Sequence, residues 1–167
     1  MAKYNWGKKS NEVLNTLHED WKIILPIVLN RSIFDLSLLF GHRKPELQFE
    51  FFKKGRIEVN GKWKIRDRSK VVTFKDGYDL KSKHNLIPSP AVDIGIYIPK
   101  RKDFTYDKNS LIYLAGLIHS VSVELYIQGK ITHLVKWGGN WDNDNIILKD
   151  QIFMDLCHFE LYKPKGE

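Results

Sequence analysis

The order of the periodic segments constrains the fold most. Two segments, 10–29 and 111–126, repeat apolar residues at three- and four-residue steps, which is the period of an amphipathic helix. Ser10 is the expected cap of the first helix, and Pro26 is expected to kink or divide it near its end. Strand-like runs lie at 34–40, 91–98, 131–137 and 157–162. Because helices and strands do not alternate regularly, the sequence predicts an α+β fold with a small, mostly antiparallel sheet and helices packed on it.

The connections between these elements contain one more helix and a charged region. Pro45 suits a first helical turn and Gly55 suits a helix end, so a helix is expected between them. Residues 56–82 are charged and rich in turn residues such as Asn60-Gly61, which indicates a loop region with short strands. The cluster 142–145 predicts a polar turn.

The composition is that of one globular domain, expected to span 1–167. Of the 167 residues, 43% are hydrophobic and 28% are charged, and a chain of this length buries roughly 70% of its unfolded surface. Twenty-seven Lys and Arg against 20 Asp and Glu give a net charge of +7. This charge favours anionic partners such as nucleic acid, acidic lipid or an anionic cell wall, without choosing among them.

Several classes of protein are excluded by what the sequence lacks. Cys157 is the single cysteine, so neither an intramolecular disulfide framework nor a zinc site built on several thiolates can form. Residues 1–10 are not followed by the apolar stretch of a signal peptide. The apolar run 23–29 contains Pro26 and falls short of the roughly 20 residues that span a bilayer. We therefore expect a protein made in the cytoplasm, with no membrane span.

Common catalytic motifs are missing as well: GxGxxG, GxxxxGK[ST], GxSxG, HExxH and CxxC do not occur. What remains is a scattered set of imidazoles and carboxylates, including His84, Asp93 and His158. Two imidazoles and one carboxylate on separate elements suit a three-ligand zinc site with one open position, as catalytic zinc requires. Spacing alone does not decide whether these residues form a zinc site, because six His in one chain also produce such sets by chance.

Longer motifs carry a resemblance to a known family. In chain order they are GHRKPELQ at 41–48, HNLIPSPAVD at 84–93, WGGNW at 137–141 and DLCHFE at 155–160. In this order they resemble the zinc-dependent D-alanyl-D-alanine carboxypeptidase and L-alanyl-D-glutamate peptidase family, whose members include bacteriophage endolysins. The resemblance covers about residues 10–162. It implies a small α+β fold with a zinc site at the sheet.

The resemblance also implies a role for individual residues. His84, Asp93 and His158 would bind Zn²⁺, and Asp155 would act as the general base. Zinc lowers the pKa of its bound water to about 7, so that a carboxylate can take the proton as the water attacks an amide carbonyl. Eight residues separate His84 from Asp93 where the usual family pattern has six, and Asp155 matches the branch that carries Asp in place of Glu.

Two further site residues precede the ligands. By the resemblance, Arg43 would face the oxyanion and stabilise the negative charge that develops in the tetrahedral intermediate. Ser82, two residues before His84, is an expected substrate contact. Glu160 shares the strand face of His158, and the pattern leaves open whether it orients that imidazole or faces solvent.

Most other candidate residues have structural explanations. His18 and His119 are expected to be surface or satisfied core residues, and His42 is expected to be structural or a substrate contact beside the cleft. His133 alternates with apolar neighbours, which predicts a hydrogen-bonded core imidazole. Cys157 is expected to be buried and inert.

The predicted function is a zinc metallopeptidase that hydrolyses the stem peptide of bacterial peptidoglycan, with the L-alanyl-D-glutamate bond as the expected target. We expect a monomeric phage or prophage endolysin that reaches the periplasm after the membrane is permeabilised, with no nucleic-acid partner. A D,D-carboxypeptidase of the same fold, a basic nucleic-acid-binding domain and a peptidoglycan-binding pseudoenzyme are the alternatives.

Overall fold

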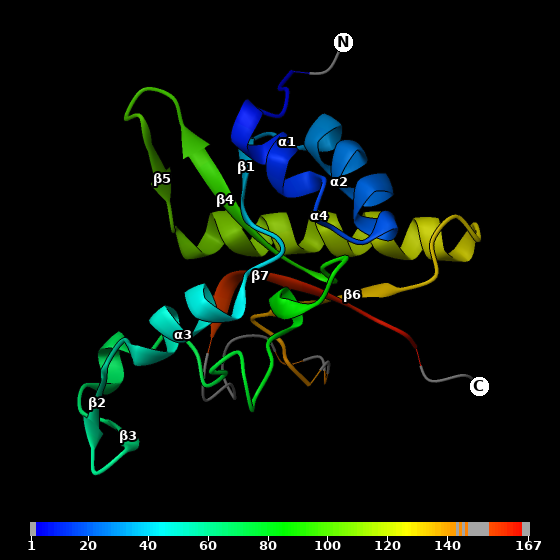
Figure 1. Cartoon of the computed structure of the whole chain (residues 1–167). Coiled ribbons are helices and arrows are strands. Elements are labelled where there is room, and N and C mark those ends of the chain that lie inside the picture. The colour runs from blue at the N-terminus through cyan, green and yellow to red at the C-terminus, as the bar shows by residue number, and fades with distance from the viewer. Residues whose placement is uncertain (1–2, 143, 145, 147–153, 165–167) are drawn as a thin grey trace.

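An antiparallel sheet forms the centre of the fold (Figure 1). The structure, a computed structural model, describes residues 3–142, 144, 146 and 154–164. Within them the sheet runs in the order β1 (Asp35–Phe40), β4 (Ala91–Ile98), β7 (Asp155–Tyr162) and β6 (Leu134–Gly138), with β5 (Asp103–Thr105) paired to β4. Every pairing in this sheet is antiparallel. The predicted α+β class with a small antiparallel sheet is confirmed.

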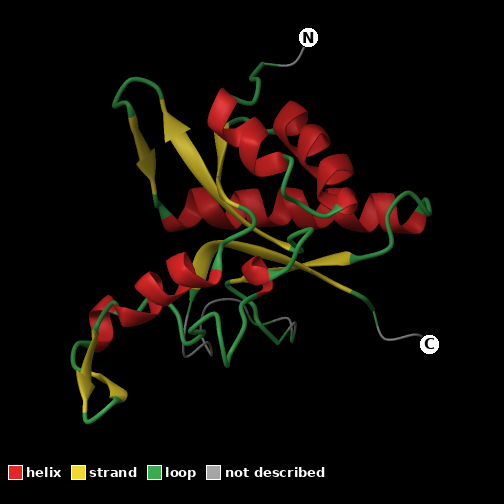
Figure 2. Ribbon diagram, in the orientation of Figure 1, coloured by secondary structure: helices red, strands yellow, loops and turns green. Residues whose placement is uncertain are grey.

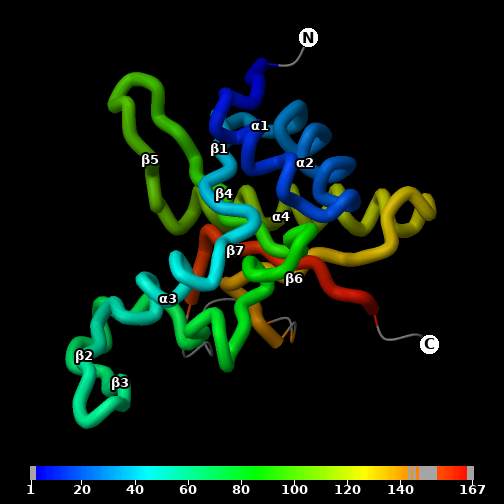
Figure 3. The backbone as a smooth tube through the Cα atoms, in the orientation of Figure 1, coloured from blue at the N-terminus to red at the C-terminus, as the bar shows by residue number. Residues whose placement is uncertain are grey.

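Helices pack on the sheet and bury its apolar side chains (Figure 2). Helix α2 (Glu19–Arg31) lies beside α4 (Lys108–Ile127), which also contacts β6 and β7 (Figure 3). The core includes fully buried side chains from α2, β4, α4 and β7: Trp21, Ile24, Ile94, Leu114, Ile118 and Phe159. This burial is the main stabilisation that a chain without disulfides can obtain.

The single helix predicted over 10–29 is wrong. The segment forms two helices, α1 (Lys8–Leu14) and α2, separated at 15–18. The break is set by a distant partner: the Ser89 backbone NH donates to the Thr16 carbonyl at 2.8 Å, and the His18 NH donates to the Ser89 carbonyl at 2.9 Å. His18 then caps α2, because its Nδ1 accepts from the Asp20 NH at 3.1 Å.

The predicted roles of Ser10 and Pro26 also change. Ser10 lies inside α1, and its hydroxyl oxygen accepts from the Leu38 NH at 3.1 Å, which fastens the helix to β1. Pro26 lies inside α2, which continues to Arg31, so it does not divide the helix, and the predicted kink stays a prediction. A local sequence pattern defines neither the contact of Ser10 with Leu38 nor the continuation of α2 past Pro26.

Helix α4 is longer than the predicted 111–126. Its N-terminus is capped by Asp107, whose carboxylate accepts from the Ser110 NH at 2.8 Å. By length and composition alone α4 is apolar enough to cross a membrane, but a core helix passes the same test. Here Leu111, Val121 and Leu125 lie in the core, which explains its apolar character.

The charged region after β1 forms an arm, residues 45–83, which projects from the sheet (Figure 1). It begins with α3 (Pro45–Lys53), where Pro45 occupies the first turn as predicted, and continues through the hairpin of β2 (Arg56–Val59) and β3 (Lys62–Ile65). Asn60 and Gly61 turn this hairpin with φ of 52° and 73°, as primed turns require. Strands β2 and β3 confirm the short strands expected in this region. The 3₁₀ turns η1 (Arg68–Lys70) and η2 (Lys83–Asn85) follow them.

Other boundaries differ from the predictions by a few residues. Strand β6 begins at Leu134, not at 131, and β7 begins at Asp155, not at 157. Strand β5 was not predicted, because a three-residue strand carries almost no periodic signal. In the turn predicted at 142–145, residues 143 and 145 lie outside the described residues.

Candidate metal centre

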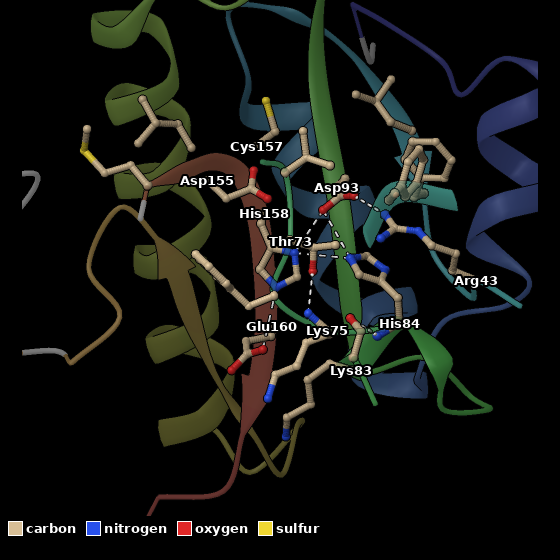
Figure 4. A pocket seen from close by; sticks show the side chains of 18 of the residues that line it. Arg43, Thr73, Lys75, Lys83, His84, Asp93, Asp155, Cys157, His158 and Glu160 are labelled. Carbon is tan, nitrogen blue, oxygen red and sulfur yellow. Dashed lines mark hydrogen bonds and ion pairs between the residues drawn. The ribbon is translucent and has the colours of Figure 1, made fainter. Parts of the chain in front are cut away.

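Three side chains from separate elements converge beside the sheet (Figure 4). His84 comes from η2, Asp93 from β4 and His158 from β7, where Asp93 and His158 are direct cross-strand partners. Asp93 Oδ1 lies 3.2 Å from His84 Nε2 and 3.0 Å from His158 Nδ1. The two imidazole nitrogens are 3.2 Å apart. The structure therefore brings together the three residues predicted to bind zinc.

In each imidazole, one nitrogen faces away from Asp93 and has a partner of its own. That partner determines which ring nitrogen carries the proton and which carries the lone pair. The Nδ1–H of His84 donates to the Gly41 carbonyl at 2.6 Å, which leaves Nε2 as an acceptor. His158 Nε2 lies 3.6 Å from Glu160 Oε2, so a proton on Nε2 faces a carboxylate. Metal-binding imidazoles commonly have such a carbonyl or carboxylate behind them. When both imidazoles are neutral, as metal binding requires, the lone pairs of His84 Nε2 and His158 Nδ1 point at the position between them and Asp93.

The donor set fits a zinc ion. Zinc takes nitrogen and carboxylate ligands at about 2.0–2.1 Å in a tetrahedron, which places neighbouring donor atoms about 3.3 Å apart. The observed separations between the donor atoms of His84, Asp93 and His158 are 3.0–3.2 Å. A bound cation would also give the convergent lone pairs a common partner. These three residues would hold the metal.

Arg43 binds Oδ2 of Asp93, the carboxylate oxygen opposite the one that faces the two imidazoles. Its Nη2 donates to Asp93 Oδ2 at 2.9 Å, and its Nη1 donates to Gln48 Oε1 at 2.9 Å. The guanidinium packs against the rings of Phe40 and Phe51, at 4.8 and 4.6 Å from their centroids. Arg43 therefore positions a predicted ligand and also borders the cavity. Its predicted role toward an oxyanion remains a prediction.

The charges in the cluster shift the ionisation of its members. Burial alone would raise the pKa of Asp93, but hydrogen bonds and positive charge from His158 and His84 hold it well below its usual range. Burial would lower the pKa of His158, yet its hydrogen bonds with Asp93 and Glu160 raise it to about 9. The pKa of Asp155 is raised, first by burial and then by the charge of Asp93. A raised pKa suits a carboxylate that must accept and return a proton.

A bulge in β7 places Asp155 in the same cavity as His158. Residues three apart in a regular strand point to opposite faces. Here Trp137 pairs with Phe159 while the next residue, Gly138, pairs with Asp155, so β7 accommodates extra residues between the two pairs. A Cβ on Gly138 would lie 2.2 Å from the Asp155 carbonyl oxygen, so the close pairing requires glycine. Within the WGGNW turn, Gly138 thus has a structural role.

The cluster opens into a cavity of about 1070 Å³ between the arm and the end of β7. Asp155, Cys157, Glu160 and Ser82 line it together with the three predicted ligands. Ser82 caps η2, where its hydroxyl oxygen accepts from the His84 NH at 3.3 Å. It therefore fixes the backbone of the first ligand, and its contact with a substrate remains a prediction.

Glu160 and Cys157 differ in what they can do. Glu160 faces His158 Nε2, which favours the orienting role over the solvent-facing alternative. Cys157 is half-buried, and burial together with the charges of Asp155 and Asp93 raises its thiol pKa to about 12. A thiol with that pKa is inert at neutral pH, as expected.

A second His–Asp–His group, which sequence reasoning did not connect, joins α2 to the start of β6. Asp20 Oδ2 accepts from the Thr132 NH at 3.0 Å, the His133 NH at 3.0 Å and His133 Nδ1 at 2.8 Å. The hydrogen bond predicted for His133 is confirmed, although its side chain is half-buried. Because these bonds give Asp20 Oδ2 donors from both Thr132 and His133, they explain the group as a structural link.

The other two imidazoles lie apart from both groups. His119 is exposed on α4, as expected for a surface residue. His42 is half-buried, and its Nδ1 lies 3.3 Å from the Leu86 carbonyl oxygen. The Leu86 contact favours a local structural role for His42, and its contact with a substrate remains a prediction.

Comparison with known proteins gives a match at the level of fold. No protein-family model matches the chain, and a search of curated proteins finds no match. Among solved structures, the chain is similar to the L-Ala D-Glu endopeptidase ChiX of Serratia marcescens, with a TM-score of 0.62 and 19% sequence identity. The alignment covers 96% of this chain and 92% of that one. Over nearly its whole length, the chain therefore has the fold of that endopeptidase.

Proposed function

We propose that this protein is a zinc metallopeptidase that hydrolyses the stem peptide of bacterial peptidoglycan at the L-alanyl-D-glutamate bond. The observation that carries the proposal is the convergence of His84 Nε2, Asp93 Oδ1 and His158 Nδ1 in a cavity that the half-buried Asp155 also lines. The shared fold with an L-Ala D-Glu endopeptidase supports the choice of substrate.

The residues around the predicted ligands suit amide hydrolysis. When bound, zinc supplies a Lewis acid and lowers the pKa of water to about 7. Asp155 takes a proton from the attacking water and returns it to the leaving amine, for which its raised pKa is suitable. Arg43 contributes fixed positive charge at the cavity wall, where negative charge develops on the carbonyl oxygen.

The experiment is digestion of purified peptidoglycan, with and without a chelator and after addition of zinc, with the fragments identified by mass spectrometry. The expected products are peptides with a new free amino group on D-glutamate, formed only when zinc is present. Release of terminal D-alanine alone would identify a D,D-carboxypeptidase. No cleavage by protein that carries zinc would contradict the proposal.

The biological role that we propose is that of a phage or prophage endolysin, a monomer acting in the periplasm after membrane permeabilisation. The family resemblance and the net charge of +7 support this role, because the charge favours contact with anionic wall polymers. Expression inside Gram-negative cells should cause lysis only when a membrane-permeabilising protein is produced with it. Lysis without such a lesion would contradict the proposed route to the wall.

A further inference from the structure

The net charge of the protein is concentrated in one part of the arm. Residues 53–83 contain 11 Lys and Arg against four Asp and Glu, a net charge of +7. The whole chain also has a net charge of +7, so positive and negative residues balance in the rest of the sequence. The arm is therefore the region of the molecule to which an anion is most strongly attracted.

This charge reaches the cavity of the metal centre. Lys54, Lys75, Lys81 and Lys83 are exposed arm residues that line it. Lys83 directly precedes the predicted ligand His84. Figure 4 shows Lys75 and Lys83 on the same side of the predicted ligands as Glu160, with Asp155 on the other side.

The cavity-lining lysines are available to a ligand. Within the described part of the chain, the ion pairs made by arm lysines are Lys53–Glu50 and Lys70–Asp67. Both pairs use lysines outside the cavity lining. An exposed ammonium group that makes no ion pair can bind a carboxylate without first breaking a salt bridge.

The substrate chemistry offers carboxylates at the right place. A glutamate residue has two carboxyl groups and uses only one of them to continue a peptide chain. A substrate cleaved before D-glutamate therefore presents a further carboxylate, or its amide, within one residue of the scissile bond. Lysine binds such a group as a compact charge, and the low-dielectric walls of a cleft strengthen the attraction.

We propose that Lys75 and Lys83, with Lys54 and Lys81 beside them, bind free carboxylates of the substrate peptide and make the enzyme selective for anionic stems over amidated ones. This inference rests on the proposed function and specifies the substrate of the same site. It assigns the arm a role in recognition, separate from the chemistry of Asp155 and the predicted zinc ligands.

The test compares two double variants on two peptides. Lys75→Gln with Lys83→Gln removes two charges from the cavity, and Lys62→Gln with Lys64→Gln removes two charges from β3, outside the cavity lining. The peptides differ only in whether the D-glutamate carboxylate is free or amidated. We expect wild type to favour the free carboxylate by about 10- to 100-fold in kcat/KM, chiefly through KM, as loss of a charge-assisted hydrogen bond implies.

The first double variant should lose this preference with little change in kcat, and the β3 control should keep it. Equal cleavage of both peptides by wild type would overturn the proposal while leaving the peptidase function intact. Equal rises in KM in the two double variants would also overturn it, because they would show a general effect of net charge.

A binding measurement separates this proposal from the proposed function. Calorimetric titration of the metal-free protein with the free-carboxylate peptide requires no turnover. Binding that weakens in the Lys75→Gln, Lys83→Gln variant and not in the β3 control supports the recognition site, even if no peptide is cleaved. Binding that is unchanged in the cavity variant contradicts it. All the substituted lysines are exposed, so thermal unfolding should show folded proteins of similar stability.

Discussion

Asp93 and His158 are direct partners across β4 and β7, and Asp93 Oδ1 lies 3.0 Å from His158 Nδ1. The register of the sheet therefore fixes two of the three predicted zinc ligands relative to each other. Only His84 comes from outside the sheet, and its Nδ1–H bond to the Gly41 carbonyl holds it in place. A site built on paired strands in this way is pre-organised before a metal arrives.

The first prediction is that removal of His158 abolishes zinc binding, whereas removal of His133 does not. His158→Ala deletes one of three predicted ligands, while His133→Ala disturbs the link to Asp20, which contains none of them. The measurement is metal content per chain after dialysis against a zinc buffer. Retention of one zinc by the His158→Ala protein would contradict the assigned site.

The second prediction concerns protons released on metal binding. The His158 imidazole has a pKa of about 9 in the metal-free protein, so it is protonated at pH 7. Because a ligand imidazole must be neutral, zinc binding at pH 7 should release close to one proton from His158. Titration calorimetry in two buffers of different ionisation enthalpy measures this number. Release should decline as the pH rises through 9, and an unchanged value at pH 10 would argue against His158 as the source.

The third prediction concerns stability in acid. Burial alone would raise the pKa of Asp20, but the hydrogen bonds from His133 and Thr132 outweigh it and lower the pKa below its ordinary value of 3.8. A lowered folded-state pKa stabilises the protein above 3.8, and this contribution is lost as the pH falls through the folded-state value. Asp20→Asn should therefore lower the free energy of unfolding by about 1–3 kcal/mol at pH 7.

The difference between wild type and Asp20→Asn should shrink as the pH approaches 2. Urea unfolding of the two metal-free proteins at several pH values provides the measurement. Subtraction of the two curves cancels the titration of every other carboxylate. A difference that stays constant between pH 7 and pH 2 would show that the charge of Asp20 contributes nothing.

The sequence predicts those parts of the molecule whose signal is local. Pro45 and Gly55 define α3, and Asn60-Gly61 defines the hairpin, because each acts through its own backbone geometry. Motifs and not spacing identify the three predicted ligands, since His158 follows Asp93 by 65 positions in the chain. The structure then supplies the distances between their donor atoms.

The parts that could not be predicted depend on partners far away in the chain. The break between α1 and α2 follows from the hydrogen bonds between Ser89 and the backbone at 16–18. The link from Asp20 to His133 spans 113 residues and leaves no periodic trace. The bulge that turns Asp155 into the cavity depends on its pairing with Gly138. In each case the determining interaction is tertiary, so local propensity is overridden.

The last prediction distinguishes two roles of Arg43. Its guanidinium bridges Gln48 and the far oxygen of Asp93, a contact that a lysine cannot reproduce with one ammonium group. If Arg43 positions the ligand, Arg43→Lys should weaken zinc binding by about 10- to 100-fold, the usual effect of losing a partner of a metal ligand. Competition with a chromogenic chelator measures this affinity, with Gln48→Ala as a second variant that loosens the same guanidinium. Unchanged zinc affinity together with a large fall in kcat would instead assign Arg43 wholly to the reacting carbonyl oxygen.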